Sequence, residues 1–257
     1  MKQTLFIVLT IFLLSACSHK NVHPSTATEK SSLSQEDSFD DEFESEFETK
    51  KEVSDPLIAY NRAMTSFNDT LYTYAYNPIS KGYAFIVPEL GRIGISNFFD
   101  NLKFPINFSN NLLQLKFDHS IKELGRFMIN STVGLLGFID VASYLGVEAH
   151  EEDFGQTLGH YGVGSGFHIV LPFLGPSNLR DALSLSADVA LSPISYTGQE
   201  YQIPRNFEET MAVQTAYYVN KNSLHLGEYE SLKKDALDYY LFFRDAYEQK
   251  RDREIEE

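Results

Sequence analysis

The chain has 257 residues, of which 36 are acidic and 21 are basic, and its formal net charge at pH 7 is −15. Because nucleic acids and anionic lipid headgroups attract basic surfaces, this charge argues against a nucleic-acid partner and against electrostatic docking onto a membrane. A hydrophobic content of 43% is sufficient for one folded domain with tails.

The first residues have the features of a secretory signal. Lys2 precedes an apolar run from Leu5 to Leu14, which is too short to span a bilayer. Small residues follow, and then Cys17, the only cysteine of the sequence, so no intramolecular disulfide is expected. Leu14 to Cys17 resembles the lipobox of bacterial lipoproteins. We therefore expect a signal peptide at 1–16, acyl chains on Cys17 and, because no Asp follows this cysteine, a place in the outer membrane.

The next segment, residues 17–52, is predicted to be a lipidated N-terminus followed by an acidic, disordered linker. It is rich in Ser, Thr, Glu and Asp, and such a composition buries too little apolar surface to fold. Phe39, Phe43 and Phe47 recur every four residues between its carboxylates. On a helix they would share one face suited to a partner's groove, but a disordered spacer is the favoured interpretation.

Residues 53–250 are predicted to form one all-α domain, followed by a charged, frayed tail at 251–257. Asp55-Pro56 has the composition of a helix start, and the apolar residues between Leu57 and Tyr74 recur at spacings of three and four. Asn77-Pro78 is expected to end or bend this helix. Further helices are expected after 87–88, after 104–105, from Ser177, at 207–221 and at 228–250, with one short strand at 168–171.

Residues 132–147 form an almost entirely apolar segment in which Asp140 is the only charged residue. The segment is shorter than the roughly 20 residues needed to cross a bilayer. A buried core helix is the favoured interpretation, and a helix hairpin lying partway into the membrane is the alternative.

Catalytic and metal-binding motifs do not emerge from the sequence. Ser165 lies in a glycine-rich stretch, but Val163 occupies the position before it where a hydrolase elbow needs glycine, and Phe167 occupies the last glycine position of a dinucleotide-binding motif. His150 and the three acidic residues after it have no zinc-type spacing. We therefore expect no enzyme activity, no catalytic residue, no metal and no cofactor. A phospholipase outside the known motif remains the less favoured alternative.

Asparagines recur inside the apolar stretches, and buried amides are costly unless they are paired. Two interpretations are equally open for this set: the amides pair with each other and with helix ends, or they face a water-filled passage. The residues are Asn68, Asn97, Asn101, Asn110, Asn111 and Asn130.

The order of short motifs resembles the MlaA/VacJ family of outer-membrane lipoproteins. The resemblance extends from about Asp55 to Asp188, with one further match in the last predicted helix. The matching segments are Asp55-Pro56-Leu57, Asn61-Arg62, Phe67-Asn68, Val87-Pro88, Ser96-Asn97-Phe98, Asn110 to Gln114, Gly125-Arg126-Phe127, Asn130 to Gly134, Gly137 to Asp140, the glycine-rich stretch 154–177, and Arg244 to Tyr247.

The resemblance implies a ring-shaped helical lipoprotein, held in the outer membrane by its acyl chains and by amphipathic helices and facing the periplasm. Its implied function is to remove mislocalised phospholipid from the outer leaflet and pass it to a soluble periplasmic lipid carrier. A porin trimer is the implied membrane partner, and a structural lipoprotein that braces porin without transport is the alternative. The implied channel or gating residues are Phe67, Asn68, Asn97, Asn130 and Asp140.

Overall fold

The computed structural model describes residues 53–195 and 204–257. The described residues belong to the second of the chain's two units, Glu52–Glu257. Cys17 and the three linker phenylalanines lie outside the described residues. The all-α prediction is confirmed, because helices account for nearly all regular structure here. None of the helices described is both long and apolar enough to cross a membrane.

The first helices form an almost continuous rod. Helix α3 covers Ile58–Leu71, a π-helical turn η1 covers Tyr72–Tyr76, and α4 covers Asn77–Ile86. The predicted helix start at Asp55 is too early, since α3 is preceded by Leu57 at its N-cap, and the Asp55 carboxylate instead accepts hydrogen bonds from Asn61 and Tyr240. Pro78 lies in the first turn of α4, where its missing N–H costs little, so the chain continues helically past it.

Prolines lie at the starts of the first two helices of the next segment, as predicted, whereas no proline precedes the third. Helix α5 covers Glu89–Leu102 with Pro88 at its N-cap, α6 covers Phe104–Leu113, and α7 covers Phe117–Thr132. Two short helices follow, α8 at Val141–Tyr144 and α9 at Phe154–His160.

A two-stranded antiparallel sheet lies between the helices. Strand β1 covers His168–Leu171, as the sequence predicts, and pairs with β2 at Gly175–Asn178, so that His168 is opposite Asn178. The turn between them contains Phe173 with a φ of 68°, and β2 begins at Gly175 with a φ of 88°. Asn178 then caps α10, Leu179–Leu191, by accepting from the Asp181 N–H, which confirms a helix start here.

The C-terminal helices differ from the expectation. Helix α11 covers Phe207–Leu224, but residues 228–250 are not one helix: α12 covers Glu228–Asp235 and α13 covers Tyr239–Glu256. The break follows from Asp238, whose carboxylate caps α13 through the N–H groups of Tyr240 and Leu241. The predicted frayed tail is also helical, because Arg251 is buried and bonds to Asp153 and Asp181.

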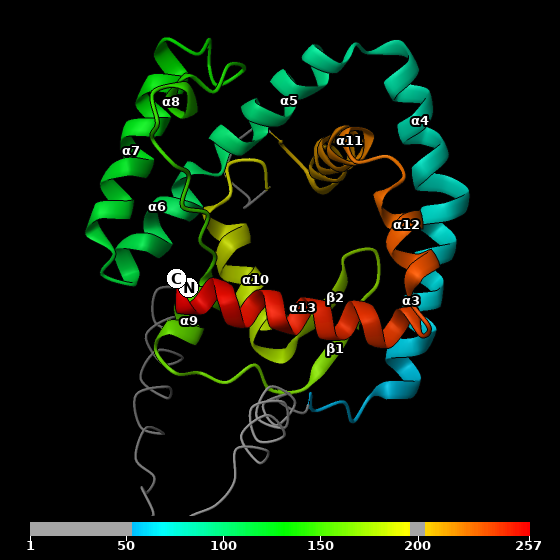
Figure 1. Cartoon of the computed structure of the whole chain (residues 1–257). Coiled ribbons are helices and arrows are strands. Elements are labelled where there is room, and N and C mark those ends of the chain that lie inside the picture. The colour runs from blue at the N-terminus through cyan, green and yellow to red at the C-terminus, as the bar shows by residue number, and fades with distance from the viewer. Residues whose placement is uncertain (1–52, 196–203) are drawn as a thin grey trace, which may run out of the picture. The chain divides into compact units, whose positions relative to one another are not determined.

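Within the second unit, the elements follow a closed path (Figure 1). Helix α5 contacts α6 and α7, α6 contacts α9, α9 contacts α13, and α13 contacts β2, which in turn contacts α3. Helix α11 lies inside this path, seen nearly along its axis in Figure 1, and packs against α4 and α5.

The burial pattern is the reverse of that in a water-soluble core. In the described part of the chain, the buried core hydrophobic residues are few: Ala142, Val170, Tyr217, Val219 and Tyr240. The interior contacts between elements are instead dominated by polar side chains, among them many asparagines. Large apolar side chains are exposed along α3 to α8, with Phe85 at 92% exposure. So many exposed apolar side chains on successive helices favour a surface that contacts a membrane or another protein.

Candidate functional site

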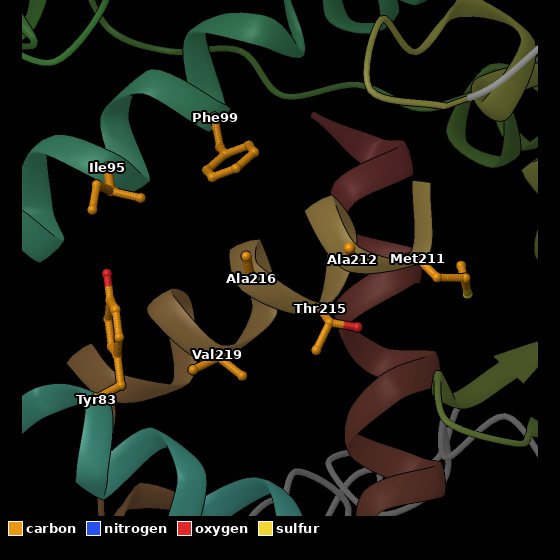
Figure 2. Close-up of a pocket in the computed structure, with 8 residues that line it drawn as sticks. All are labelled: Tyr83, Ile95, Phe99, Met211, Ala212, Thr215, Ala216 and Val219. Atoms are coloured by element: carbon orange, nitrogen blue, oxygen red, sulfur yellow. The ribbon is translucent and has the colours of Figure 1, made fainter. Parts of the chain in front are cut away.

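An apolar pocket of about 590 Å³ lies between α4, α5 and α11. Figure 2 shows Ile95 and Phe99 extending from α5 towards α11, with Tyr83 reaching in from α4. The α11 wall contains Ala212 and Ala216, whose short side chains leave space between the helices. Apart from the hydroxyls of Tyr83 and Thr215, its lining is apolar, so the pocket suits hydrocarbon. The remaining lining residues are Met211 and Val219.

A second, polar pocket of about 190 Å³ lies between α5, α6 and α7 and the segment after α7. Its lining combines four asparagine amides, four carboxylates, one guanidinium and two phenylalanine rings. These residues are Asn97, Asp100, Asn101, Phe104, Asn107, Glu123, Arg126, Phe127, Asn130, Asp140 and Glu151, joined by Ser143 and Ala149.

Helix α5 separates the two pockets. Ile95 and Phe99 are four residues apart and share the face turned to the apolar pocket. Asn97 and Asn101 are also four apart and line the polar pocket on another face. One amphipathic helix therefore forms a wall of both compartments.

An ion-pair network centred on Asp140 holds one side of the polar pocket. Arg126 donates to both Asp140 oxygens, at 3.1 and 2.9 Å, and Asn130 donates to Oδ1 at 2.9 Å. The same carboxylate caps α8 through the Ser143 N–H. Burial acts to raise the pKa of Asp140, but the hydrogen bonds from Ser143, Asn130 and Arg126 outweigh it and hold that pKa below its usual value.

The opposite side of the polar pocket contains Glu123, which is 5% exposed and forms no salt bridge with any residue that the structure describes. Its oxygens accept from the His150 N–H at 2.8 Å and from the Asn107 amide at 3.4 Å. Burial raises the pKa of the Glu123 carboxyl above its ordinary value. For Lys103 beside the pocket, burial lowers the pKa, but Glu151 and Asp100 raise it more strongly, so its ammonium stays charged.

The segment after α7 closes the polar pocket against α5. The Asn97 amide donates to the Phe138 carbonyl at 3.3 Å, and the Phe98 and Phe138 rings stack with centroids 5.1 Å apart. Gly137, with a φ of 97°, lies so close to Asn101 that a Cβ would come within 2.6 Å of its side chain. Only glycine fits this position, since it lacks that atom and tolerates positive φ.

The favoured core-helix interpretation of residues 132–147 is wrong. Helix α7 ends at Thr132, a turn follows, and only Val141–Tyr144 resumes a helix. Leu135 and Leu136 lie in this turn, 65% and 67% exposed, at positive φ values of 54° and 62°. Glycine is required at both ends of this tight turn, because Gly137 has a φ of 97° and a Cβ at Gly134 would lie 2.1 Å from the Ile139 carbonyl oxygen; the leucines of the turn are exposed and do not enter a core.

Phe67 and Asn68 lie outside both pocket linings, against the β1–β2 turn. Asn68 donates to the Leu171 carbonyl at 2.9 Å and accepts from the Phe173 N–H at 2.8 Å. The Phe67 ring meets the Phe173 ring edge-on, with centroids 5.5 Å apart. These two residues therefore fasten α3 to the β turn.

The MlaA lipoprotein family model matches residues 53–254, nearly all of the second unit. This chain belongs to the MlaA lipoprotein family. The intermembrane phospholipid transport system lipoprotein MlaA of Escherichia coli (strain K12) is 32% identical over 203 residues, 77% of this chain and 77% of that protein. Its counterpart in Haemophilus influenzae (strain ATCC 51907) is 32% identical over 204 residues, 77% of this chain and 78% of that protein.

Other similarities agree with this membership. An uncharacterized protein of Rickettsia bellii (strain RML369-C) is 32% identical over 207 residues, 80% of this chain and 78% of that protein. A solved structure, described as the structural basis for maintenance of bacterial outer membrane lipid asymmetry, matches with a TM-score of 0.67 and 32% identity. The match covers 79% of this chain and 99% of that one. The motif resemblance to the MlaA family is thus confirmed.

Three of the predicted MlaA-family site residues, Asn97, Asn130 and Asp140, line one pocket, although their functional roles remain predictions. For the asparagines as a group, the pairing interpretation is confirmed for the members whose amides bond to other elements, and a water-filled passage stays a prediction. Asn110 and Asn111 are fully buried and bond to neighbouring elements, whereas Asn97, Asn101 and Asn130 line the polar pocket.

Sequence reasoning missed Glu123 and Arg126 as pocket residues and missed the apolar pocket entirely. For Glu123 and Arg126, a signal was available: each is a charged residue less than one helical turn away from apolar residues on the predicted helix. For the apolar pocket no local signal exists, because α11 packs against α4 and α5 from more than 100 residues away in sequence.

Proposed function

We propose that this protein removes mislocalised phospholipid from the outer leaflet of the outer membrane and passes it to a soluble periplasmic lipid carrier. In this proposal, acyl chains on Cys17 anchor the protein, which faces the periplasm beside a porin trimer. The name of its E. coli relative, an intermembrane phospholipid transport system lipoprotein, supports the transport class.

The observation that carries the proposal is the pairing of an exposed apolar surface with two chemically different pockets. Exposed apolar side chains along α3 to α8 favour embedding in hydrocarbon without a membrane-crossing helix. The apolar pocket suits acyl chains, and the polar pocket suits a headgroup. A membrane lipid is the ligand class that needs both environments.

The physical need for such a protein follows from the cost of extracting a lipid. Exposing acyl chain to water costs about 0.8 kcal/mol per CH₂, so a two-chain phospholipid faces roughly 20 kcal/mol or more if it leaves the bilayer unaided. Apolar contacts that replace the bilayer along the route lower this barrier without any covalent step. The protein needs neither a nucleophile nor a cofactor for that task.

The test is to label surface-exposed phospholipid on intact cells with and without the gene. We expect exposed phospholipid to rise on deletion and to return to normal when the intact protein is restored. Cys17→Ala should fail to restore it, whereas the neighbouring Ser18→Ala should succeed, because it leaves the lipidation cysteine in place.

Two outcomes would contradict the proposal. An unchanged level of surface phospholipid on deletion would favour a structural lipoprotein that braces porin. Release of lysophospholipid or fatty acid by the purified protein, abolished by a single Ser or His substitution, would instead show a phospholipase.

A further inference from the structure

The polar pocket has an excess of hydrogen-bond acceptors. The side-chain amides of Asn97, Asn101 and Asn107 each donate to another protein group, to the Phe138 carbonyl, Ser131 Oγ and Glu123 respectively. Within 53–195 and 204–257, no donor bonds to their Oδ1 atoms. Asn107 is only 7% exposed as a residue, but its Oδ1 is not among the buried atoms that lack a partner, so this oxygen is open to the pocket that Asn107 lines. A ligand with several N–H or O–H donors would satisfy these atoms.

The pocket also has an excess of negative charge. Its lining contributes the carboxylates of Asp100, Glu123, Asp140 and Glu151 and the single cation Arg126. Lys103 adds a second cation beside it, 2.7 Å from Asp100 and 3.9 Å from Glu151. Four carboxylates against two cations leave two negative charges uncompensated. Among the described residues, no cationic side chain forms an ion pair with the buried Glu123 within 4 Å; the charge of Arg126 acts to lower its pKa, but Arg126 itself pairs with Asp140.

A metal ion is not the cation that these groups suit. Among the described residues, no group of three or more His, Cys, Asp or Glu side chains is arranged to hold one. The pocket instead combines separated oxygens with two aromatic rings, Phe104 and Phe127, stacked with centroids 4.4 Å apart. Aromatic faces and carboxylates together attract organic cations.

We propose that the polar pocket binds the primary ammonium of an aminoalkyl phospholipid headgroup, with Glu123 as counter-ion and the amide oxygens of Asn101 and Asn107 as acceptors. An alkylammonium has one positive charge and three N–H donors, which match the single unpaired carboxylate and the unpaired amide oxygens. This assignment rests on the proposed function and adds a headgroup preference to it.

The experiment compares two lipids with identical acyl chains, phosphatidylethanolamine and phosphatidylcholine, bound to the full-length lipidated protein in detergent micelles at neutral pH. The choline ammonium has no N–H donor, so only the ethanolamine headgroup satisfies the amide oxygens. We expect the ethanolamine lipid to bind about tenfold more tightly, the size of one charge-assisted hydrogen bond. Glu123→Gln should reduce that ratio to near one.

Asp235→Asn is the matched control, since it removes the same charge from an exposed residue of α12, and it should keep the tenfold ratio. If Glu123→Gln fails to fold, Glu151→Gln changes an exposed pocket carboxylate and should lower the ratio severalfold. Free ethanolamine at millimolar concentration distinguishes the lipid from a soluble amine. Displacement by free ethanolamine without any preference between the lipids would overturn the lipid assignment.

The remaining outcomes separate this inference from the proposed function. Equal binding of the two lipids by the unsubstituted protein, or an unchanged ratio in Glu123→Gln, would overturn the ammonium site while transport stands. Failure of both lipids to bind would contradict the proposed function itself.

Discussion

Polar side chains join the elements of this protein. Asn61 is fully buried, and its amide donates to Asp55 and to the His168 carbonyl while its oxygen accepts from the Val170 N–H. One side chain on α3 thereby fixes the position of β1. Each such bond contributes about 1 kcal/mol to stability, but a buried amide left unpaired costs more than that. An arrangement of the elements that leaves such an amide without a partner is therefore disfavoured.

At this scale, Asp140→Asn tests the network beside the polar pocket. The substitution keeps an N-cap oxygen for the Ser143 N–H but removes the negative charge that Arg126 pairs with. We expect the free energy of unfolding to fall by about 1–3 kcal/mol, measured by chemical denaturation in detergent. Ser143→Ala, which removes one neutral donor, should cost less than half as much. Equal losses in the two variants would show that the charge is unimportant.

Asp188 predicts a pH dependence with a defined sign. Burial and the nearby Asp153 raise its pKa from 3.8 to about 6, although the Phe154 N–H and Asn110 bond to the carboxylate. The folded state binds the Asp188 proton more tightly than the unfolded state does. The stability that this protonated carboxyl contributes is therefore present below pH 3.8 and is lost as the pH rises through 6. Relative to Asp188→Asn, the melting temperature of the unsubstituted protein should therefore fall between pH 4 and pH 6. A constant difference across that range would contradict the pKa.

At the scale of elements, α9, α10 and α13 meet around one arginine. Arg251 of α13 donates to both oxygens of Asp153, which precedes α9, and to Asp181 of α10. The Tyr247 hydroxyl adds a bond to Asp181 at 2.8 Å. One ionic cluster thus joins these three helices. Its side chains pack closely enough to leave no room for an added Cβ at Gly155.

Gly155→Ala measures how tightly that junction is packed. A Cβ at this position would lie 2.4 Å from Asp181 Oδ1 and 2.8 Å from the Arg251 guanidinium. We expect a loss of about 1–3 kcal/mol in the free energy of unfolding, because the ionic cluster must shift. Gly164→Ala is the matched control, since a Cβ there meets nothing within 4 Å, and it should be nearly neutral. Similar stability in both variants would contradict the close packing.

The attachment of α3 to the β1–β2 turn gives a functional prediction. Deleting Phe67 and Asn68 removes their contacts with that turn and shifts the rest of the α3 seam by about half a turn. We expect cells that carry this deletion to have a leaky outer membrane, measured as detergent and antibiotic sensitivity. Normal resistance would contradict a role for these residues in controlling lipid passage.

A double substitution separates the two effects of that deletion. Phe67→Ala with Asn68→Ala removes the contacts with the turn but keeps the helical register of every later residue. If lost contacts cause the leak, this variant should also sensitise cells, whereas unchanged resistance would assign the effect to the register shift.

On the scale of the whole molecule, the burial pattern predicts affinity for a bilayer beyond that of the acyl anchor. Leu135→Asn with Leu136→Asn tests this, because Asn tolerates the positive φ of both positions and the turn should keep its conformation. In a Cys17→Ser background, we expect at least a tenfold loss of liposome binding, since two exposed leucines no longer bury apolar area. Replacing both leucines with Met keeps that area and should preserve binding. Equal binding by the Asn and Met variants would place this turn outside the membrane.

Much of the helical structure could be predicted from particular residues. Pro88 and Pro105 separate helices as expected, and Asn178 caps α10 where the sequence indicates a helix start. The break at Asp238 was missed although Asp followed by an apolar run is a cap signal. Part of the site was predictable as well, since Asn97, Asn130 and Asp140 stand out as polar residues in apolar surroundings.

Local patterns in the sequence determined where helices form and which of their faces are apolar, because helical periodicity and capping act over only a few residues. Which distant residues meet was decided only by the tertiary structure, as in the joining of Glu123, Asn107 and Asn101 in one pocket. The tertiary structure also decided that the apolar segment 132–147 turns outwards. Periodicity shows that a face is apolar, but whether protein or lipid covers it depends on how the whole chain packs.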